Sequence, residues 1–133
     1  MNQTDRENIR KLIGILNLIR AFNPDMPLQH AVAFLHIAVQ PGINITELAG
    51  VQQTLLQSAS RHAHALAGAR IAKRVGLVAV GYGVDGRTKA LLLTDEGRRL
   101  ANGVAAAMAS SNLSVTSPVP PVLRPVASVG DSM

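Results

Sequence analysis

ITELAGVQQTLLQSASR, at residues 45–61, contains the clearest structural signal in the sequence. Its apolar spacing predicts two short helices joined by a tight turn. Further along, GLVAV at 76–80 and VDGRTKALLLTDEG at 84–97 predict a β-hairpin, because Asp85-Gly86 is a turn signal between two strand-like runs. Helix, turn, helix and hairpin in this order predict a winged helix-turn-helix, a mainly α fold with a small β-hairpin wing.

Both helices of the helix-turn-helix have recognisable start signals. Asn44 and Glu47 are spaced to cap the first, and Thr54 and Gln57 are spaced to form a capping box for the second. The second helix is expected over 54–67, with its buried stripe at 3-4-3 spacing. The residues of that stripe are Leu56, Ala59, Ala63 and Leu66.

Longer helices are expected on both sides of this motif. The first is predicted over 4–22, opening with a Thr4–Glu7 capping box, and the next over 27–40. A last helix follows the cap residue Thr94 and runs to about residue 109. Along the 27–40 helix, one row is apolar: Leu28, Val32, Leu35 and Val39. Residues 1–109 are therefore expected to form one domain, followed by a flexible Ser/Pro/Val-rich tail over 110–133.

The apolar arc of the first helix is wider than one small core needs. Three roles stay open for the excess: a dimer interface, an intrachain core and an amphipathic membrane contact. Mixed charges on the same helix, with Asp5 and Glu7 beside Arg6 and Arg10, disfavour the membrane. A homodimer is the favoured interpretation.

The positive charge is concentrated in one segment. The 133-residue chain has a formal charge of +5, and residues 55–99 hold eight basic residues against three acidic ones, while the charges on either side cancel. An excess confined to one segment indicates a polyanionic partner such as nucleic acid. A solvated basic surface is the alternative.

Several functions are excluded or disfavoured. The chain has no cysteine, so disulfides, thiolate metal sites and cysteine nucleophiles are absent. His62 and His64 would point about 200° apart on a helix, so no metal site and no cofactor are expected. No nucleophile-elbow pattern surrounds a serine, and no enzyme activity is expected. No apolar run approaches the roughly 20 residues that span a bilayer, so no membrane partner and a cytoplasmic location are expected.

Three segments of the chain carry a family resemblance: MPLQHAVAFLHIA at 26–38, ITELA and SASRH within 45–62, and the DGRTKALLLTDEGRRLA run that follows. In these segments the chain resembles the MarR family of winged-helix transcriptional regulators. The resemblance covers roughly residues 5–109. It implies a homodimer joined through its N- and C-terminal helices and bound to palindromic double-stranded DNA. It also implies that the 54–67 helix enters the major groove and that the 81–89 wing lies beside it.

The residues expected at the DNA lie on the 54–67 helix, in the basic stretch 68–74 and on the wing. They are Thr54, Gln57, Ser58, Ser60, Arg61, His62, His64, Arg70, Lys73, Arg74, Asp85, Arg87 and Lys89. The resemblance implies that Arg87 reaches the minor groove, held by Asp85, with Lys89 near phosphate. The chain departs from the family at Gln52 and Gln53, where glycine is often found, and in the length of 68–74.

The sequence therefore predicts a sequence-specific DNA-binding regulator, most simply a homodimeric repressor that occludes a promoter. Two alternatives remain: a winged-helix adaptor that binds proteins, and an architectural or replication-associated DNA-binding protein. A small-molecule effector is compatible with the resemblance, whereas oxidation sensing through cysteine is not.

Overall fold

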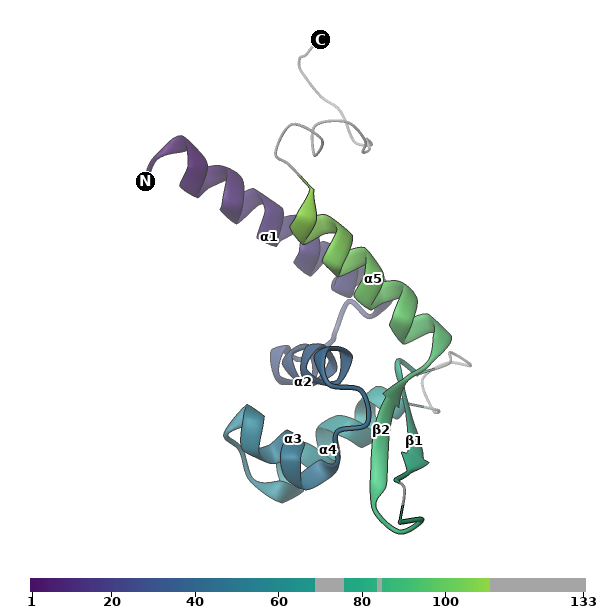
Figure 1. Ribbon diagram of the computed structural model, residues 1–133. Coiled ribbons are helices and arrows are strands. Elements are labelled where there is room, and N and C mark those ends of the chain that lie inside the picture. Colours follow the sequence, from purple (N-terminus) through teal and green to yellow (C-terminus); the bar gives the residue numbers. More distant parts are fainter. Residues whose placement is uncertain (69–75, 84, 111–133) are drawn as a thin grey trace. The chain divides into compact units, whose positions relative to one another are not determined.

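The computed structural model of the protein describes residues 1–68, 76–83 and 85–110 (Figure 1). The basic residues Arg70, Lys73 and Arg74, and all of the tail expected over 110–133 except Ser110, lie outside this part. The described residues form two compact units, one within residues 19–103 and the other made of residues 1–18 with 104–110. The elements in chain order are α1 (Gln3–Phe22), α2 (Leu28–Val39), α3 (Ile45–Gln52), α4 (Leu56–Ala67), β1 (Val78–Tyr82), β2 (Lys89–Leu93) and α5 (Asp95–Ala109).

The larger unit is a winged helix-turn-helix. Helices α2, α3 and α4 pack on one another, and the antiparallel hairpin of β1 and β2 packs against them (Figure 1). The hairpin pairs Val78 with Leu93 and Tyr82 with Lys89. Ile43 forms an isolated antiparallel bridge with Leu91 of β2, in which the Ile43 carbonyl accepts from the Leu91 amide at 2.9 Å. The predicted mainly α fold with a small wing is confirmed.

One apolar core holds these elements together. Its buried members come from α2, α3, α4, the hairpin and the segments just before α3 and β1: Ala33, Phe34, Ile37, Ile43, Leu48, Ala49, Ala59, Ala63, Leu66, Leu77, Val78 and Leu91. The apolar row expected along α2 is not its buried side, because Leu28, Val32 and Val39 are exposed. Phe34 and Ile37 on another face are fully buried instead.

Two of the predicted helix starts are confirmed in atomic detail. The Asn44 side chain accepts from the Glu47 amide at 2.8 Å, and the Glu47 carboxylate accepts from the Asn44 amide at 3.0 Å. Thr94 caps α5, where its hydroxyl accepts from the Gly97 amide at 3.0 Å and donates to the Gly76 carbonyl at 2.7 Å. The second bond also ties the start of α5 to the chain entering β1.

The other two predicted capping boxes are wrong. Helix α1 begins earlier than expected, and its cap is Asn2, whose side chain accepts from the Asp5 amide at 2.8 Å. Helix α4 begins at Leu56 rather than in the 54–55 region, and its N-cap is Leu55, which has no side-chain acceptor. The spacing of Thr54 and Gln57 is compatible with a box, but the helix starts one residue later than a Thr54 cap requires.

The turn between α3 and α4 is closed by Gln53 in the left-handed conformation, with φ 54° and ψ 48°. The Thr54 amide donates to the Ala49 carbonyl at 3.0 Å, which completes the cap of α3. A position of this kind favours glycine, so the glutamine there carries backbone strain.

The smaller unit contains most of α1 and the end of α5. In it, the ammonium group of Lys11 donates to the Met108 carbonyl at 3.2 Å. Ile15 is buried, whereas several large apolar side chains among the described residues of this unit are exposed. They are Ile9, Leu12, Ile13, Leu16, Leu18 and Met108. None of the described helices is both long and apolar enough to cross a membrane.

Candidate nucleic-acid interface

One face of α4 is polar and open to solvent. Gln57, Arg61 and His64 are exposed on it, and Ser58 and Ser60 are partly exposed. These residues follow each other at intervals of three and four, which brings them to adjacent positions along one side of the helix. The Arg61 guanidinium donates to the Ser58 hydroxyl at 3.3 Å, a bond that orients the arginine along the helix. Thr54 is partly exposed in the turn before α4.

His62 does not belong to this face, and its expected DNA contact is corrected. The side chain is 6% exposed and lies on the core side of α4, between Ala59 and Leu66. Its ring centroid is 5.1 Å from that of His30 in α2. A side chain enclosed in this way has no access to a DNA duplex. The helical spacing placed His62 at the edge of the stripe, and the packing of α2 turned it inward.

His62 instead joins three helices through hydrogen bonds. Gln52, at the end of α3, donates to the Gln29 carbonyl in α2 at 3.1 Å, which directs its amide oxygen to Nδ1 of His62 at 3.2 Å. Nε2 of the ring lies 3.2 Å from the Gln29 amide oxygen. A neutral ring has one N–H, which Nδ1 can donate to the Gln52 amide oxygen. Nε2 then accepts a hydrogen bond when the Gln29 amide is rotated so that its nitrogen faces the ring. This cluster fixes α4 relative to α2 and α3.

Burial, followed by the positive charge of Arg61, lowers the pKa of His62 below its ordinary value of 6.5. Burial and then the charge of His62 lower the pKa of His30 in the same way. Both shifts favour uncharged rings in the folded protein. The neutral forms are the ones that suit a close histidine pair.

An open hollow runs between the start of α3 and the exposed face of α4. It is lined by Ile45, Thr46, Leu56, Gln57, Ser60 and Arg61. Of these, Ile45, Thr46 and Leu56 were missed as site residues from the sequence. The apolar spacing predicts Leu56 in the buried stripe, yet it is 54% exposed. The stripe that is buried begins at Ala59, one turn further along.

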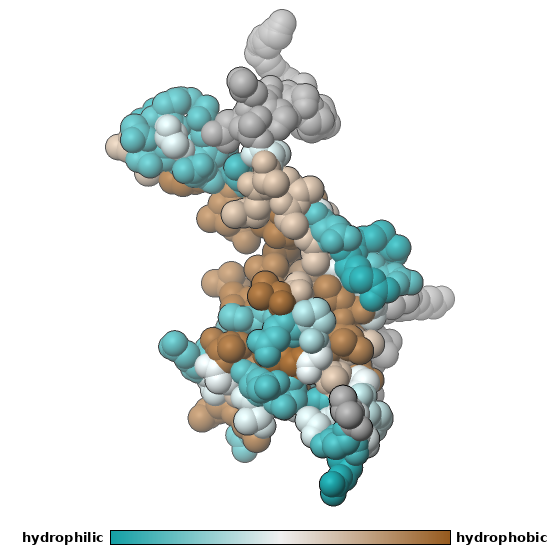
Figure 2. Space-filling view, in the orientation of Figure 1, coloured by the Kyte–Doolittle hydropathy of each residue, from teal (hydrophilic) through white to brown (hydrophobic). Residues whose placement is uncertain are grey.

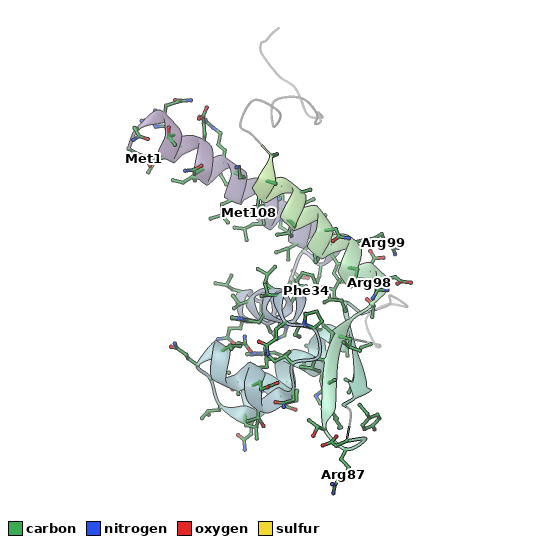
Figure 3. The ribbon with its side chains drawn as sticks, in the orientation of Figure 1. Met1, Phe34, Arg87, Arg98, Arg99 and Met108 are labelled. Carbon is green, nitrogen blue, oxygen red and sulfur yellow. The ribbon has the colours of Figure 1, made fainter. Side chains whose placement is uncertain are left out.

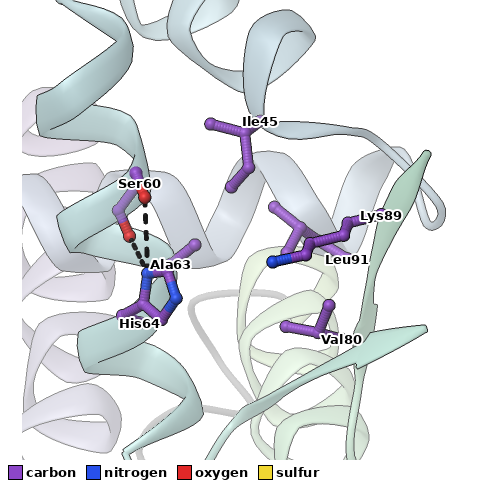
Figure 4. Close-up of a pocket in the computed structure, with 7 residues that line it drawn as sticks. All are labelled: Ile45, Ser60, Ala63, His64, Val80, Lys89 and Leu91. Carbon is purple, nitrogen blue, oxygen red and sulfur yellow. Dashed lines mark hydrogen bonds between the residues drawn. The ribbon is translucent and has the colours of Figure 1, made fainter. Parts of the chain in front are cut away.

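A second, smaller hollow adjoins the first and reaches the wing (Figure 4). Ile45, Ser60, Ala63, His64, Val80, Lys89 and Leu91 line it. Nδ1 of His64 lies 2.7 Å from the Ser60 carbonyl, and the Lys89 side chain extends from β2 toward α4 (Figure 4). Because Ser60 lines both hollows, the exposed face of α4 and the wing form one continuous surface, which we call the α4–wing surface.

The wing tip is held by Asp85. Its carboxylate accepts from the Arg87 amide at 2.9 Å, from the Thr88 amide at 2.9 Å and from the Thr88 hydroxyl at 2.8 Å. The bond from the Thr88 amide, followed by those from the Arg87 amide and the Thr88 hydroxyl, lowers the pKa of Asp85. Gly86 takes the positive φ of 73° that the turn requires. Asp85 therefore positions the backbone of Arg87 and is itself a structural residue of the tip.

Arg87 projects beyond the end of the hairpin (Figure 3). The tip is hydrophilic on the face shown in Figure 2, in agreement with the exposure of Asp85, Arg87 and Lys89. Both ion pairs found among the described residues lie within 95–99 of α5. In this part of the chain, Arg61, Arg87 and Lys89 thus have no carboxylate within ion-pair distance. Their charge is available to an anion.

The α4–wing surface combines cations with groups that read hydrogen-bond patterns. An arginine and a glutamine one helical turn apart match guanine and adenine edges in a major groove, and cations at the periphery match phosphates. Across residues 1–68, 76–83 and 85–110, no cluster of three or more histidine and acidic side chains is placed to hold a metal ion. The exposed cations and hydrogen-bonding side chains together suit the α4–wing surface to recognition of an extended polyanion.

The sequence matches no protein-family model and no curated protein. Solved structures match its fold. A MarR-like transcriptional regulator from Thermotoga maritima aligns with a TM-score of 0.60 at 20% identity, over 87% of this chain and 81% of that one. The transcriptional repressor CouR, bound to a 23-mer DNA duplex, aligns with a TM-score of 0.53 at 23% identity, over 86% and 75%.

A third structure, the S. aureus MepR–DNA complex, aligns with a TM-score of 0.52 at 14% identity, over 80% of this chain and 76% of that one. The chain is thus a winged helix-turn-helix protein. Within that class, its fold is that of the MarR-like regulators, with helices before and after the winged motif.

Proposed function

We propose that this protein is a sequence-specific double-stranded DNA-binding transcriptional regulator that inserts α4 into the major groove and lays the wing beside it. One observation carries the proposal: Gln57 and Arg61 are exposed together on the hollow that Ser60 joins to Lys89. Gln57 and Arg61 supply base discrimination, and Lys89 supplies salt-dependent attraction to phosphate. Arg87, at the far end of the wing, is the candidate for the minor groove.

The exposed apolar side chains of α1 support a homodimer. Four of them, at positions 9, 12, 13 and 16, are more than two-fifths exposed, which is costly for a helix without a partner. A second copy of the chain would cover them. Two α4 helices in a symmetric dimer would then enter successive major grooves about 34–36 Å apart and require a near-palindromic site. Occlusion of a promoter by such a dimer is the simplest regulatory outcome.

The direct test is selection of bound sequences from a random duplex pool by the full chain. We expect enrichment of a near-palindrome whose half-sites are about 10 base pairs apart, and a mobility shift of that site that survives excess non-specific competitor. Binding without sequence enrichment would indicate an architectural DNA-binding protein. Failure to bind any duplex would contradict the proposal and leave the protein-binding adaptor as the function to pursue.

A further inference from the structure

Helix α4 starts with two exposed leucines. Leu55 is 71% exposed and Leu56 is 54% exposed. Leu55 occupies the N-cap, a position where serine, threonine, aspartate or asparagine would stabilise the helix through a side-chain hydrogen bond, and here no such bond is present. Single exposed leucines are ordinary on protein surfaces, so exposure alone says nothing about function.

The surroundings distinguish Leu56 from Leu55. Leu56 lines the open hollow together with Gln57, Ser60 and Arg61, whereas Leu55 is not among its lining residues. Leu56 and Ser60 are one helical turn apart, and so are Gln57 and Arg61. Two adjacent rows therefore run along α4, and the first row begins with an aliphatic group.

The chemistry of the major groove offers one apolar partner to such a group. Base edges there present donors and acceptors, and only thymine adds a methyl group, at C5. The N-terminal residues of a recognition helix are the ones that reach base edges. An aliphatic side chain at this place gains by covering a methyl group and loses when it covers an unpaired polar edge.

We propose that Leu56 is a specificity-determining residue that contacts the C5-methyl group of a thymine in each half-site, beside the bases read by Gln57 and Arg61. This inference rests on the proposed function and adds one base identity to it. The contact is made by an aliphatic side chain, so it discriminates by the methyl group alone and not by hydrogen bonding.

Replacement of thymidine by deoxyuridine tests the contact, because it removes the methyl group and preserves base pairing. The probe is the duplex that the protein itself selects from a random pool, with one thymidine replaced at a time. At one position per half-site we expect wild-type affinity to fall about fourfold, the value of one buried methylene-sized group. L56A removes the contact from both half-sites, so it should bind the thymidine duplex about sixteenfold more weakly and should no longer distinguish the two duplexes.

L55A is the matched control, since it makes the same truncation one residue away and outside the hollow. We expect it to distinguish thymidine from deoxyuridine as the wild type does. Thermal unfolding of both variants establishes that each is folded. A selected site that shows no deoxyuridine effect at any position, or an undiminished effect in L56A, would overturn this contact and leave the proposed function intact. If no sequence is selected, the proposed function and the contact both fall.

Discussion

The amide oxygen of Gln52, the last residue of α3, lies 3.2 Å from Nδ1 of His62 in α4. This bond crosses the turn of the helix-turn-helix and connects the two helices whose relative angle decides what α4 presents to a ligand. Gln52 is itself anchored to α2 through the Gln29 carbonyl. A polar cluster, rather than apolar contact alone, therefore sets the position of α4.

The histidine pair should make stability depend on pH. Because the pKa values of His62 and His30 are lowered in the folded state, the unfolded chain binds more protons near and below 6.5. The free energy of unfolding should thus have its full value above the ordinary histidine pKa and should decrease as pH falls below that pKa. Urea unfolding at about pH 7.5 and about pH 5.5 measures the difference. In H62Q the loss on acidification should be smaller, and an undiminished loss in this variant would contradict the prediction.

The strained turn predicts opposite effects for two adjacent glutamines. Gln53→Gly should stabilise the protein by about 0.5–1 kcal/mol, because glycine relieves the left-handed strain but adds some unfolded-state entropy. Gln52→Gly should destabilise it by about 2–3 kcal/mol, because it removes two hydrogen bonds and lowers helix propensity. Chemical denaturation of both variants gives the sign. Equal destabilisation would show that the turn is not strained at Gln53.

The wing tip should depend on Asp85 for its shape but not for global stability. Asp85→Ala removes the acceptor for two backbone amides and one hydroxyl, so DNA affinity should fall several-fold while the unfolding temperature changes little. Asp85→Asn retains an amide oxygen as acceptor and should keep most of the affinity. Fluorescence anisotropy with the selected duplex provides the measurement. If alanine and asparagine were equally damaging, the charge and not the turn would be responsible.

Base-reading and phosphate-contacting residues should be separable by their effects on specificity. Arg61→Ala should cost about 1–3 kcal/mol of binding free energy and relax preference at one base position. Lys89→Ala should weaken binding to all sequences and reduce the slope of log affinity against log salt by about one. Titration of specific and scrambled duplexes at several salt concentrations distinguishes the two. Uniform weakening by Arg61→Ala, with sequence preference intact, would contradict its assignment.

A charge on the exposed side of α1 should separate the subunits. Leu12 is 51% exposed in the single chain, and the second copy would cover it in the dimer. Leu12→Asp would bury a carboxylate at that interface, so it should weaken the dimer at least about tenfold. Asn17→Asp adds the same charge to the same helix at an already polar position. Sedimentation equilibrium of both variants reports the association constant. A wild-type chain that sediments as a monomer would rule out the dimer directly.

Much of the fold follows from interactions that span three or four residues. The Asn44–Glu47 capping box, the Thr94 cap and the Asp85-Gly86 turn each close a short loop of chain with groups supplied by that loop. Such features are legible in a sequence because their partners are adjacent in it. Together with the helical spacing, they were sufficient to predict a winged helix-turn-helix and the exposed polar face of its second helix.

Packing that cannot be read from the sequence set the buried side of α2 and the limits of the buried side of α4. In α4, the apolar spacing is satisfied equally well by a stripe that begins with Leu56 and by one that includes His62. Packing against α2 and the bonds from Gln29 and Gln52 buried the histidine, and the leucine was left in the hollow beside Gln57. A helical repeat fixes the angle between residues of one helix, but the free energy of burying either side depends on partners that are distant in the chain.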